Sequence, residues 1–136
     1  MDHELIEIVV VGAHLSGMPL NGELTSRGGA FRRAGWTTAD YRFHALAGGP
    51  PKRPGLLRVA DGEGAPIEVE VWALPAAEFG RFTASIPAPL CIGTVRLSDG
   101  TAPKGFLVEP AGLAGAHDIT RLGGWRAYIA SLNAAA

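Results

Sequence analysis

The sequence predicts one domain over residues 1–136 that mixes strands and helices, either an α+β domain or a small, mostly antiparallel β-barrel with packed helices. Three observations predict this class. The chain has 136 residues, which is the length of one domain. Of these residues, 47% are hydrophobic, enough to form a core without disulfide or metal support. The 19 glycines and 10 prolines keep each element short, so we expect roughly five to seven strands and two or three helices.

Strand patterns dominate the first part of the chain. Residues 5–12 are β-branched and almost continuously apolar, which predicts a central strand buried on both faces. Residues 21–27 begin with Asn21, which can cap a helix, and two glycines follow them, so a short helix is predicted. Strands are predicted over 31–37 and 41–46, and the second alternates apolar with polar side chains, as a half-exposed strand does.

A loop, a hairpin and a helix are predicted next. The prolines and glycines of residues 48–55 predict a loop inside the domain rather than a boundary between domains. Residues 56–60 and 67–74 flank a glycine-rich turn and are predicted to pair as a hairpin. Pro75 is predicted to open a helix that ends near Ser85.

The last part of the chain predicts a second hairpin and a final helix. Residues 91–97 and 103–109 are predicted to pair around the turn Ser98-Asp99-Gly100. Residues 122–132 have the spacing of an amphipathic helix that docks on the sheet. Its docking face is predicted to carry Trp125, Tyr128, Ile129 and Leu132.

Composition argues against several classes of function. Twelve basic and thirteen acidic residues give a net charge of −1 without a basic stripe, which disfavours nucleic-acid binding. The longest apolar run is far shorter than the roughly 20 residues that cross a membrane, and the acidic start is unlike a secretory signal, so we expect a cytoplasmic protein that binds no membrane. Cys91 is the single cysteine and is expected to be buried, and the four histidines are dispersed, so we expect no metal and no cofactor.

The segment 11–21 carries the strongest functional signal. A buried strand that ends at Gly12 and is followed by a tight turn and a helix start leaves backbone N–H groups free to hold an anion such as a carboxylate. The expected ligand-binding residues are Gly12, Ala13, Leu15, Ser16, Gly17, Met18, Pro19 and Asn21. His14 could act there as a general acid or base, or as a hydrogen-bond donor to a carboxylate. In the alternative interpretation, Gly12 and Gly17 only make turns and His14 caps the loop. Glycine-rich turns without a ligand are commoner than glycine-rich binding sites.

Three further residues complete the expected ligand-binding set: Tyr41, Glu70 and Lys104. Glu68 and Glu70 share one face of a strand, where one of them could project inward or both could face solvent. A buried Glu70 would need a partner such as Lys104 or Arg58. Lys104 is either a ligand anchor or an ordinary surface charge of the hairpin.

The same loop carries a family resemblance that extends from about residue 8 to residue 132. The matching segments are Val10 to Asn21, Leu24-Thr25 with Gly28-Gly29, Tyr41-Arg42, Pro51-Lys52 with Pro54-Gly55-Leu56, Ile67 to Trp72, Phe79-Gly80 with Phe82, Ile86-Pro87 with Pro89-Leu90 and Ile92 to Val95, Lys104-Gly105-Phe106, and Gly123 to Arg126 with Tyr128. In these segments the chain resembles the C-terminal domain of allophanate hydrolase. The resemblance implies a γ-glutamylcyclotransferase-like α+β fold, a small, mostly antiparallel barrel with packed helices.

The resemblance also implies an activity. Family members take part in urea degradation through allophanate, and this domain is expected to promote decarboxylation of N-carboxycarbamate, a small carboxylated metabolite that an amidase produces. His14 falls on the histidine of the family's Gly-x-His loop. We therefore expect His14→Ala to abolish decarboxylation while leaving the melting transition nearly unchanged.

Two departures limit what the resemblance implies. The sequence has no amidase half, so we expect a free-standing homologue or a piece of a longer chain that works with a separate amidase protein. Residues 82–89 hold no Asp or Glu, where the cyclotransferases carry a catalytic acid, so γ-glutamyl cyclotransferase activity is not expected. The alternative is a non-catalytic module that binds a metabolite or docks on an amidase, and a homodimer would fit such an assembly role.

Overall fold

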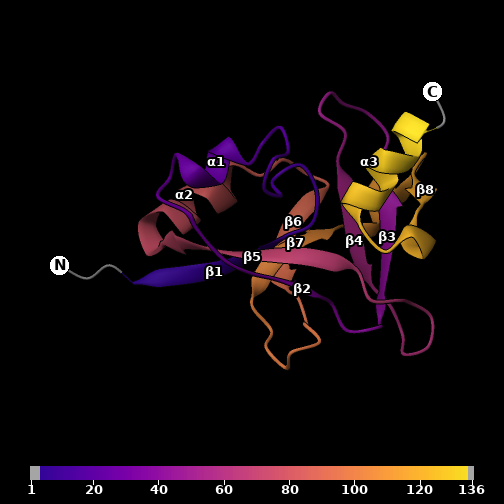
Figure 1. The fold of residues 1–136 in the computed structure, drawn as a ribbon, viewed down its shortest axis with the longest axis horizontal. Coiled ribbons are helices and arrows are strands. Elements are labelled where there is room, and N and C mark those ends of the chain that lie inside the picture. Colours follow the sequence, from indigo (N-terminus) through magenta and orange to yellow (C-terminus); the bar gives the residue numbers. More distant parts are fainter. Residues whose placement is uncertain (1–3, 135–136) are drawn as a thin grey trace.

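The computed structural model describes residues 4–134 and contains two β-sheets with three α-helices (Figure 1). The larger sheet has the strand order β2-β5-β1-β7-β6. Its strands are β1 (Leu5–Val10), β2 (Ala30–Trp36), β5 (Glu68–Pro75), β6 (Leu90–Thr94) and β7 (Lys104–Val108). The smaller sheet has the order β4-β3-β8, with β3 (Tyr41–Ala45), β4 (Pro54–Arg58) and β8 (His117–Asp118). The α+β class is therefore confirmed.

The structure does not support the predicted barrel, because the sheets are not closed. The two sheets stay separate, and β2 and β6 form opposite edges of the larger one. Closure requires the first and last strands to pair, with a matching tilt and stagger. Here β3 and β4, the two strands that follow β2, form the smaller sheet with β8 instead. Pairing is mostly antiparallel, as expected, with one parallel pair between β1 and β7.

β1 is the central strand of the larger sheet, as its apolar sequence predicts. Ile8, Val9 and Val10 are completely buried. β1 pairs with β5 on one edge and with β7 on the other. The second half of β1 has neighbours on both edges and cover on both faces, which explains why its sequence does not alternate, whereas Leu5 at its start is exposed.

The predicted hairpin between 56–60 and 67–74 does not form. β4 pairs with β3 in the smaller sheet, where Leu56 lies opposite Phe43, whereas β5 pairs with β1 and β2 in the larger one. Val69, Val71 and Ala73 of β5 are fully buried. A strand buried to this degree needs partners on both edges, and a two-stranded hairpin supplies only one. The turn signal marks a crossing between sheets.

The second predicted hairpin is confirmed. β6 and β7 pair in antiparallel register from Leu90 opposite Val108 to Thr94 opposite Lys104. Backbone bonds from Val95 to Pro103 and from Leu97 to Thr101 continue the pairing toward the turn. Cys91 on β6 is only partly buried, which corrects the expectation that it is a core residue.

The first two helices lie where the sequence predicts them, but the predicted side-chain cap of the first helix does not form. α1 (Gly22–Thr25) has Asn21 at its N-cap position, but the Asn21 side chain donates to the carbonyl of His14 instead of capping the helix. α2 (Ala76–Ser85) follows Pro75, as predicted. A 3₁₀ turn (Pro110–Leu113) follows β7.

The final helix begins later than predicted. α3 (Trp125–Ala134) is preceded by a 3₁₀ turn (Thr120–Leu122), which ends at Gly123. Trp125 is buried at the start of α3, whereas Leu132 is 38% exposed, so the expectation that Leu132 docks on the sheet is wrong. Only the first part of α3 packs against the body of the protein, because the helix projects beyond the small sheet (Figure 1).

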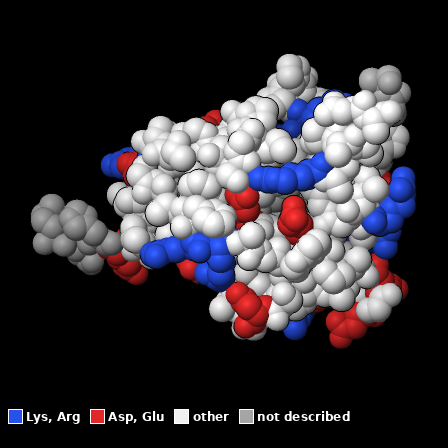
Figure 2. Space-filling view, viewed as in Figure 1, with Lys and Arg blue, Asp and Glu red and all other residues white. Residues whose placement is uncertain are grey.

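The layers leave a site between the two sheets. α1 and α2 cover one end of the larger sheet, and the smaller sheet with α3 lies at the other end (Figure 1). The segment 11–21 runs from β1 to α1 and contacts the smaller sheet at Pro54 of β4. Basic side chains on the face seen in Figure 2 are separated by acidic and uncharged ones. Between residues 4 and 134 no helix is long and apolar enough to span a membrane.

Candidate functional site

The segment between β1 and α1 is a tightly folded loop. Gly12 lies against the ring of Pro54, and a Cβ at this position would stand 2.3 Å from the Pro54 Cδ. Gly17 has a φ of +80°, which favours glycine. Backbone bonds from Leu15 to Gly12 and from Leu20 to Ala13 close the loop on itself. The glycines therefore have the structural roles of close approach and turn formation.

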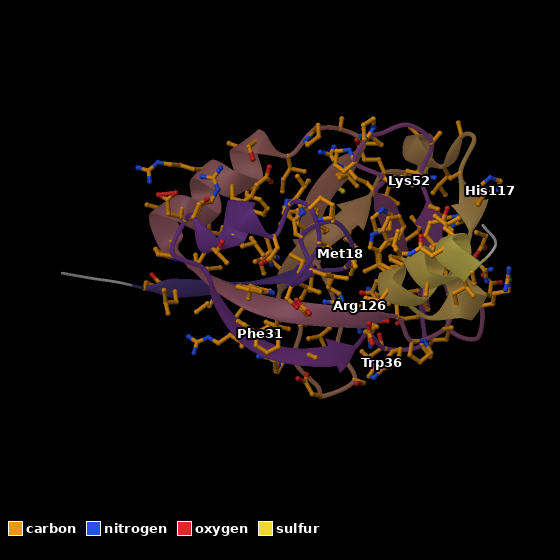
Figure 3. All side chains as sticks on the ribbon, turned by 45° about the horizontal axis from the view of Figure 1, so that its top comes forward. Met18, Phe31, Trp36, Lys52, His117 and Arg126 are labelled. Atoms are coloured by element: carbon orange, nitrogen blue, oxygen red, sulfur yellow. The ribbon has the colours of Figure 1, made fainter. Side chains whose placement is uncertain are left out.

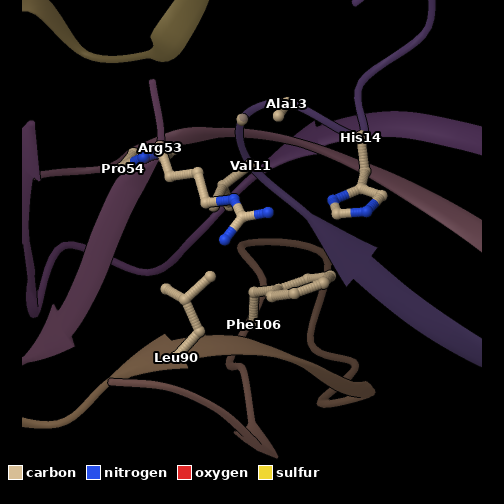
Figure 4. Close-up of a pocket in the computed structure, with 8 residues that line it drawn as sticks. Val11, Ala13, His14, Arg53, Pro54, Leu90 and Phe106 are labelled. Atoms are coloured by element: carbon tan, nitrogen blue, oxygen red, sulfur yellow. The ribbon is translucent and has the colours of Figure 1, made fainter. Parts of the chain in front are cut away.

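This loop forms one wall of a pocket (Figure 4). The pocket is lined by Val11, Gly12, Ala13, His14, Arg53, Pro54, Leu90 and Phe106. Two of these side chains, His14 and Arg53, are polar and ionisable, and the others give an apolar surface. An apolar hollow with a few convergent polar groups is the usual form of a small-molecule site.

The ring of His14 is held firmly by aromatic neighbours. It stacks on Phe106 and meets Phe82 edge to face, with centroid distances of 5.1 Å in both cases. Its side chain is 11% exposed, and its Nε2 lies 2.8 Å from the Oε1 of Glu23. Burial between the rings is the largest influence on the pKa of His14 and lowers it, although the Glu23 carboxylate opposes this effect. The free protein therefore holds a neutral imidazole near neutral pH.

The tautomer of His14 follows from its partner. A carboxylate only accepts hydrogen bonds, so Nε2–H donates to Glu23 and Nδ1 keeps its lone pair. In Figure 4 a ring nitrogen of His14 lies on the side that faces the Arg53 guanidinium. Since Nε2 is bonded to Glu23, Nδ1 is the nitrogen available to a ligand.

Arg53 is the functional candidate that the sequence-based prediction missed. It reaches into the pocket from the segment before β4 (Figure 4). Its Nε is buried without a hydrogen-bond partner, and no acidic side chain in the described part of the chain pairs with its guanidinium. Its charge is close enough to help lower the pKa of His14. In the sequence, Arg53 lies between Pro51-Lys52 and Pro54, inside the segment 48–55 that is predicted to be a loop.

Glu70 anchors the loop from β5 rather than lining the pocket. One carboxylate oxygen accepts bonds from the Ser16 N–H at 2.8 Å and the Trp72 indole at 3.0 Å. The other accepts from the Ser16 hydroxyl at 2.8 Å and from Arg126 at 3.1 Å. Burial alone raises the pKa of Glu70, but the bonds from Ser16 and Trp72 and the charge of Arg126 outweigh burial and lower it.

The expected partners of Glu70 lie elsewhere. Lys104 donates to Thr94 at the surface of the hairpin, and Arg58 pairs with Asp40. The actual partner, Arg126, begins α3 and lies at the boundary between that helix and β5 (Figure 3). The prediction failed because the first turn of α3 approaches β5 only in the folded chain.

The other expected ligand-binding residues fall into groups. Gly12 and Ala13 line the pocket beside His14. Leu15 belongs to the core, Tyr41 is completely buried with its hydroxyl accepting from the Arg96 N–H, and Lys104 is exposed. Met18, Pro19 and Asn21 lie farther along the loop, outside the pocket lining. Within residues 4–134, the structure brings His14 together with Gly12, Ala13 and Arg53, not with Tyr41 or Lys104.

The backbone amides of the loop are partly engaged. The N–H groups of Leu15 and Met18 bond to loop carbonyls, and that of Ser16 bonds to Glu70. In the described chain the N–H groups of Ala13, His14 and Gly17 have no such bond. A ligand in the pocket would therefore meet the free amides of Ala13 and His14 as well as the Arg53 guanidinium.

A second pocket adjoins the first. It shares Arg53 and Leu90 with it and is otherwise lined by 46–51 and 87–89. Arg53 is its charged residue, and the rest of its lining is uncharged and rich in proline and glycine. In residues 4–134, no group of three or more His, Cys, Asp or Glu is arranged to hold a metal ion. These residues can bind an anion at Arg53 beside the His14 imidazole, which can exchange a proton.

Comparison with known proteins identifies relatives over nearly the whole chain. Residues 6–130 match the family model of the allophanate hydrolase C-terminal domain. The chain is 42% identical to a urea amidolyase of Saccharomyces cerevisiae, over 93% of this chain and 7% of that protein. It superposes on allophanate hydrolase of Kluyveromyces lactis with a TM-score of 0.91 and 39% identity, over 95% of this chain and 22% of that one. The chain thus spans a small part of both relatives.

A shorter relative matches end to end. A uropathogenic Escherichia coli-specific protein aligns with a TM-score of 0.86 and 36% identity, over 93% of this chain and 97% of that chain. A γ-glutamyl cyclotransferase aligns with a TM-score of 0.56 and 11% identity, which shows a shared fold and no more. These similarities support the γ-glutamylcyclotransferase-like fold expected from the sequence.

Proposed function

The chain belongs to the allophanate hydrolase C-terminal domain family, and from that premise we propose that it binds a small N-carboxylated intermediate between His14 and Arg53 and promotes its decarboxylation. The intermediate is N-carboxycarbamate, formed from allophanate during urea degradation by an amidase on a separate protein or on another part of a longer one. We place this step in the cytoplasm.

One observation carries the proposal. Arg53 is half-buried, its buried Nε has no hydrogen-bond partner, and its guanidinium has no acidic partner within residues 4–134. A buried donor without a partner costs free energy, and a buried charge without one costs more. A carboxylate that binds two guanidinium N–H groups side by side would satisfy both requirements. A dicarboxylate would then extend its second end toward His14.

The reaction needs one proton and no cofactor. In N-carboxycarbamate the bond between nitrogen and one carboxylate carbon breaks, its electron pair stays on nitrogen, and CO₂ leaves. The nitrogen takes a proton, so the products are CO₂ and carbamate. Arg53 would hold the carboxylate that remains, and His14, once protonated at Nδ1, would deliver the proton to the nitrogen. The apolar walls formed by Leu90 and Phe106 favour loss of charged carboxylate as neutral CO₂.

Titration with malonate tests the binding step, because malonate is a stable dicarboxylate of similar size. We expect saturable NMR shifts of the His14 ring and of the Ala13 and His14 amides. Arg53→Gln should weaken binding at least about tenfold, since a charge-assisted bidentate contact is lost. Lys52→Gln is the matched control, because it removes the same charge one residue earlier but lines a different pocket, so it should change affinity less than about twofold. No shifts at millimolar malonate would overturn the proposal.

A coupled assay tests the chemical step. An amidase that acts on allophanate supplies the intermediate, and the wild-type domain should accelerate CO₂ release beyond the spontaneous rate. His14→Gln should abolish this acceleration and retain malonate binding through Arg53. Equal rates with wild type and with His14→Gln would remove His14 from the catalytic role.

A second candidate function is assembly, as a module that pairs with a second copy of this chain. Phe31 and Trp36 are 51% and 47% exposed (Figure 3), and β2 is an edge strand whose last residue, Trp36, accepts a backbone bond from Ser98. Exposed apolar edge strands tend to pair with other strands. A dimer by light scattering that Trp36→Glu converts to monomers would favour this candidate. A monomer that binds malonate would favour the first.

A further inference from the structure

The His14 ring is fixed on one side by α1. Glu23, in the first turn of that helix, accepts the Nε2–H bond at 2.8 Å. The Asn21 side-chain amide donates to the His14 carbonyl at 2.8 Å, which ties the backbone of the loop to the start of the same helix. Phe82 and Phe106 restrict rotation of the ring. The imidazole can therefore neither turn over nor leave Glu23 without disturbing these contacts.

We propose that Glu23 is a positioning residue that fixes the Nε2–H tautomer of His14 and so presents Nδ1 to the ligand held by Arg53. The inference rests on the proposed function for the role of the ligand, whereas the tautomer itself does not depend on any ligand. Without an acceptor at Nε2, the imidazole would distribute its proton over both nitrogens, and Nδ1–H would point at the guanidinium. That arrangement would place donor against donor.

The charged groups around His14 influence its protonation in opposite directions. Glu23 acts from α1 and favours the protonated ring, while Arg53 acts from the segment before β4 and disfavours it. Across Phe82 lies Arg27, whose guanidinium is 5.6 Å from the Phe82 ring and pairs with Glu78. A bound carboxylate offsets the charge of Arg53, so one of the two influences that lower the pKa of His14 is removed, while burial still lowers it. The geometry then favours a proton on Nδ1, because an anion lies beside it while Glu23 still accepts from Nε2.

The test uses ¹⁵N-labelled histidine in the full chain. Long-range ¹H–¹⁵N spectra near pH 7.5 should show His14 predominantly as the Nε2–H tautomer in the wild type. Glu23→Ala removes the acceptor and should lower the ratio of Nε2–H to Nδ1–H at least about tenfold, because bonds to charged groups are stronger than neutral ones. Glu23→Gln keeps an acceptor without the charge, so it should keep the tautomer and lower the pKa of His14. Glu63→Gln, at an exposed turn far along the chain, is the control and should change neither property.

The outcomes separate this inference from the proposed function. An unchanged His14 tautomer in Glu23→Ala, or an unchanged His14 pKa in Glu23→Gln, would overturn the positioning role even if malonate binds. A tautomer that depends on Glu23 in a protein that never binds malonate would support the positioning role and remove the proposed ligand. If Glu23→Ala fails to fold, the pKa of His14 in Glu23→Gln decides the question alone.

Discussion

Ser16 and Glu70 are 54 residues apart in sequence, and the N–H and hydroxyl of Ser16 each donate to a different oxygen of the Glu70 carboxylate at 2.8 Å. Arg126 donates to the same carboxylate and to the Ser16 carbonyl. The loop that carries His14 is thus held by a strand and a helix that come much later in the chain. These contacts tie the glycine-containing loop to β5 and to α3.

Removing this carboxylate should destabilise the protein. Glu70 is 7% exposed, and Glu70→Ala leaves the Ser16 N–H, the Trp72 indole N–H and the Arg126 charge without their partner. We expect a loss of about 2–4 kcal/mol in the free energy of unfolding, measured by urea denaturation. Glu68→Ala, two residues earlier on β5 and less buried, is the control and should cost under about 1 kcal/mol. Similar losses for the two variants would show that the carboxylate does not anchor the loop.

His14 should matter for packing as well as for chemistry. Its ring lies between Phe82 and Phe106, so His14→Ala leaves a cavity and should cost about 1–3 kcal/mol. This packing changes the expectation that His14→Ala leaves the melting transition unaffected. His14→Gln fills more of the space and should lose less than half as much stability. Thermal unfolding of both variants checks this, and an unshifted transition in His14→Ala would contradict the tight packing.

Gly12 should be the most sensitive glycine of the loop. A methyl group there would stand 2.3 Å from the Pro54 Cδ, and the proline ring in β4 cannot rotate away. Gly12→Ala should therefore cost about 1–3 kcal/mol and weaken malonate binding, because Pro54 is next to Arg53. Gly22→Ala meets open space in α1 and should be neutral or stabilise by up to about 1 kcal/mol. A tolerated Gly12→Ala would mean that β4 shifts freely relative to the loop.

Acid should weaken the fold partly through Asp118. Burial raises the pKa of this carboxyl, but bonds from Thr120 and Arg42 outweigh burial and lower the pKa to about 2. Because the pKa is lower in the folded than in the unfolded state, the ionised group stabilises the fold above pH 4 and stops doing so as the pH falls toward 2. The Asp118 side chain is more than one-third exposed, so the contribution should not exceed about 1 kcal/mol.

Asp118→Asn provides the measurement. Urea midpoints of wild type and variant should differ at pH 6 and converge as the pH approaches 2. Asp61→Asn, in an exposed turn, should follow the wild type at every pH. A gap that stays constant with pH would show that the charge of Asp118 is not what stabilises the link between β3 and β8.

The elements that the sequence predicted well are those defined by neighbouring residues. The apolar run of β1, the turn between β6 and β7, and the proline that precedes α2 each carry their signal within a few positions. The pairing of β4 was mispredicted because a turn between two strands does not say which strand each one joins. The apolar residues of β5 are buried on both faces between β1 and β2, and this burial depends on the whole fold rather than on neighbouring residues.

The sequence by itself determined the α+β class, most strands, the family and the loop that carries His14. It did so because strand periodicity, turn residues and the family's segments are all local patterns. The tertiary structure alone decided that the sheets stay open, that Arg53 shares a pocket with His14, and that Glu70 finds Arg126. These outcomes depend on which surfaces bury one another, and the Arg53 guanidinium becomes part of a pocket only when folding brings it beside His14.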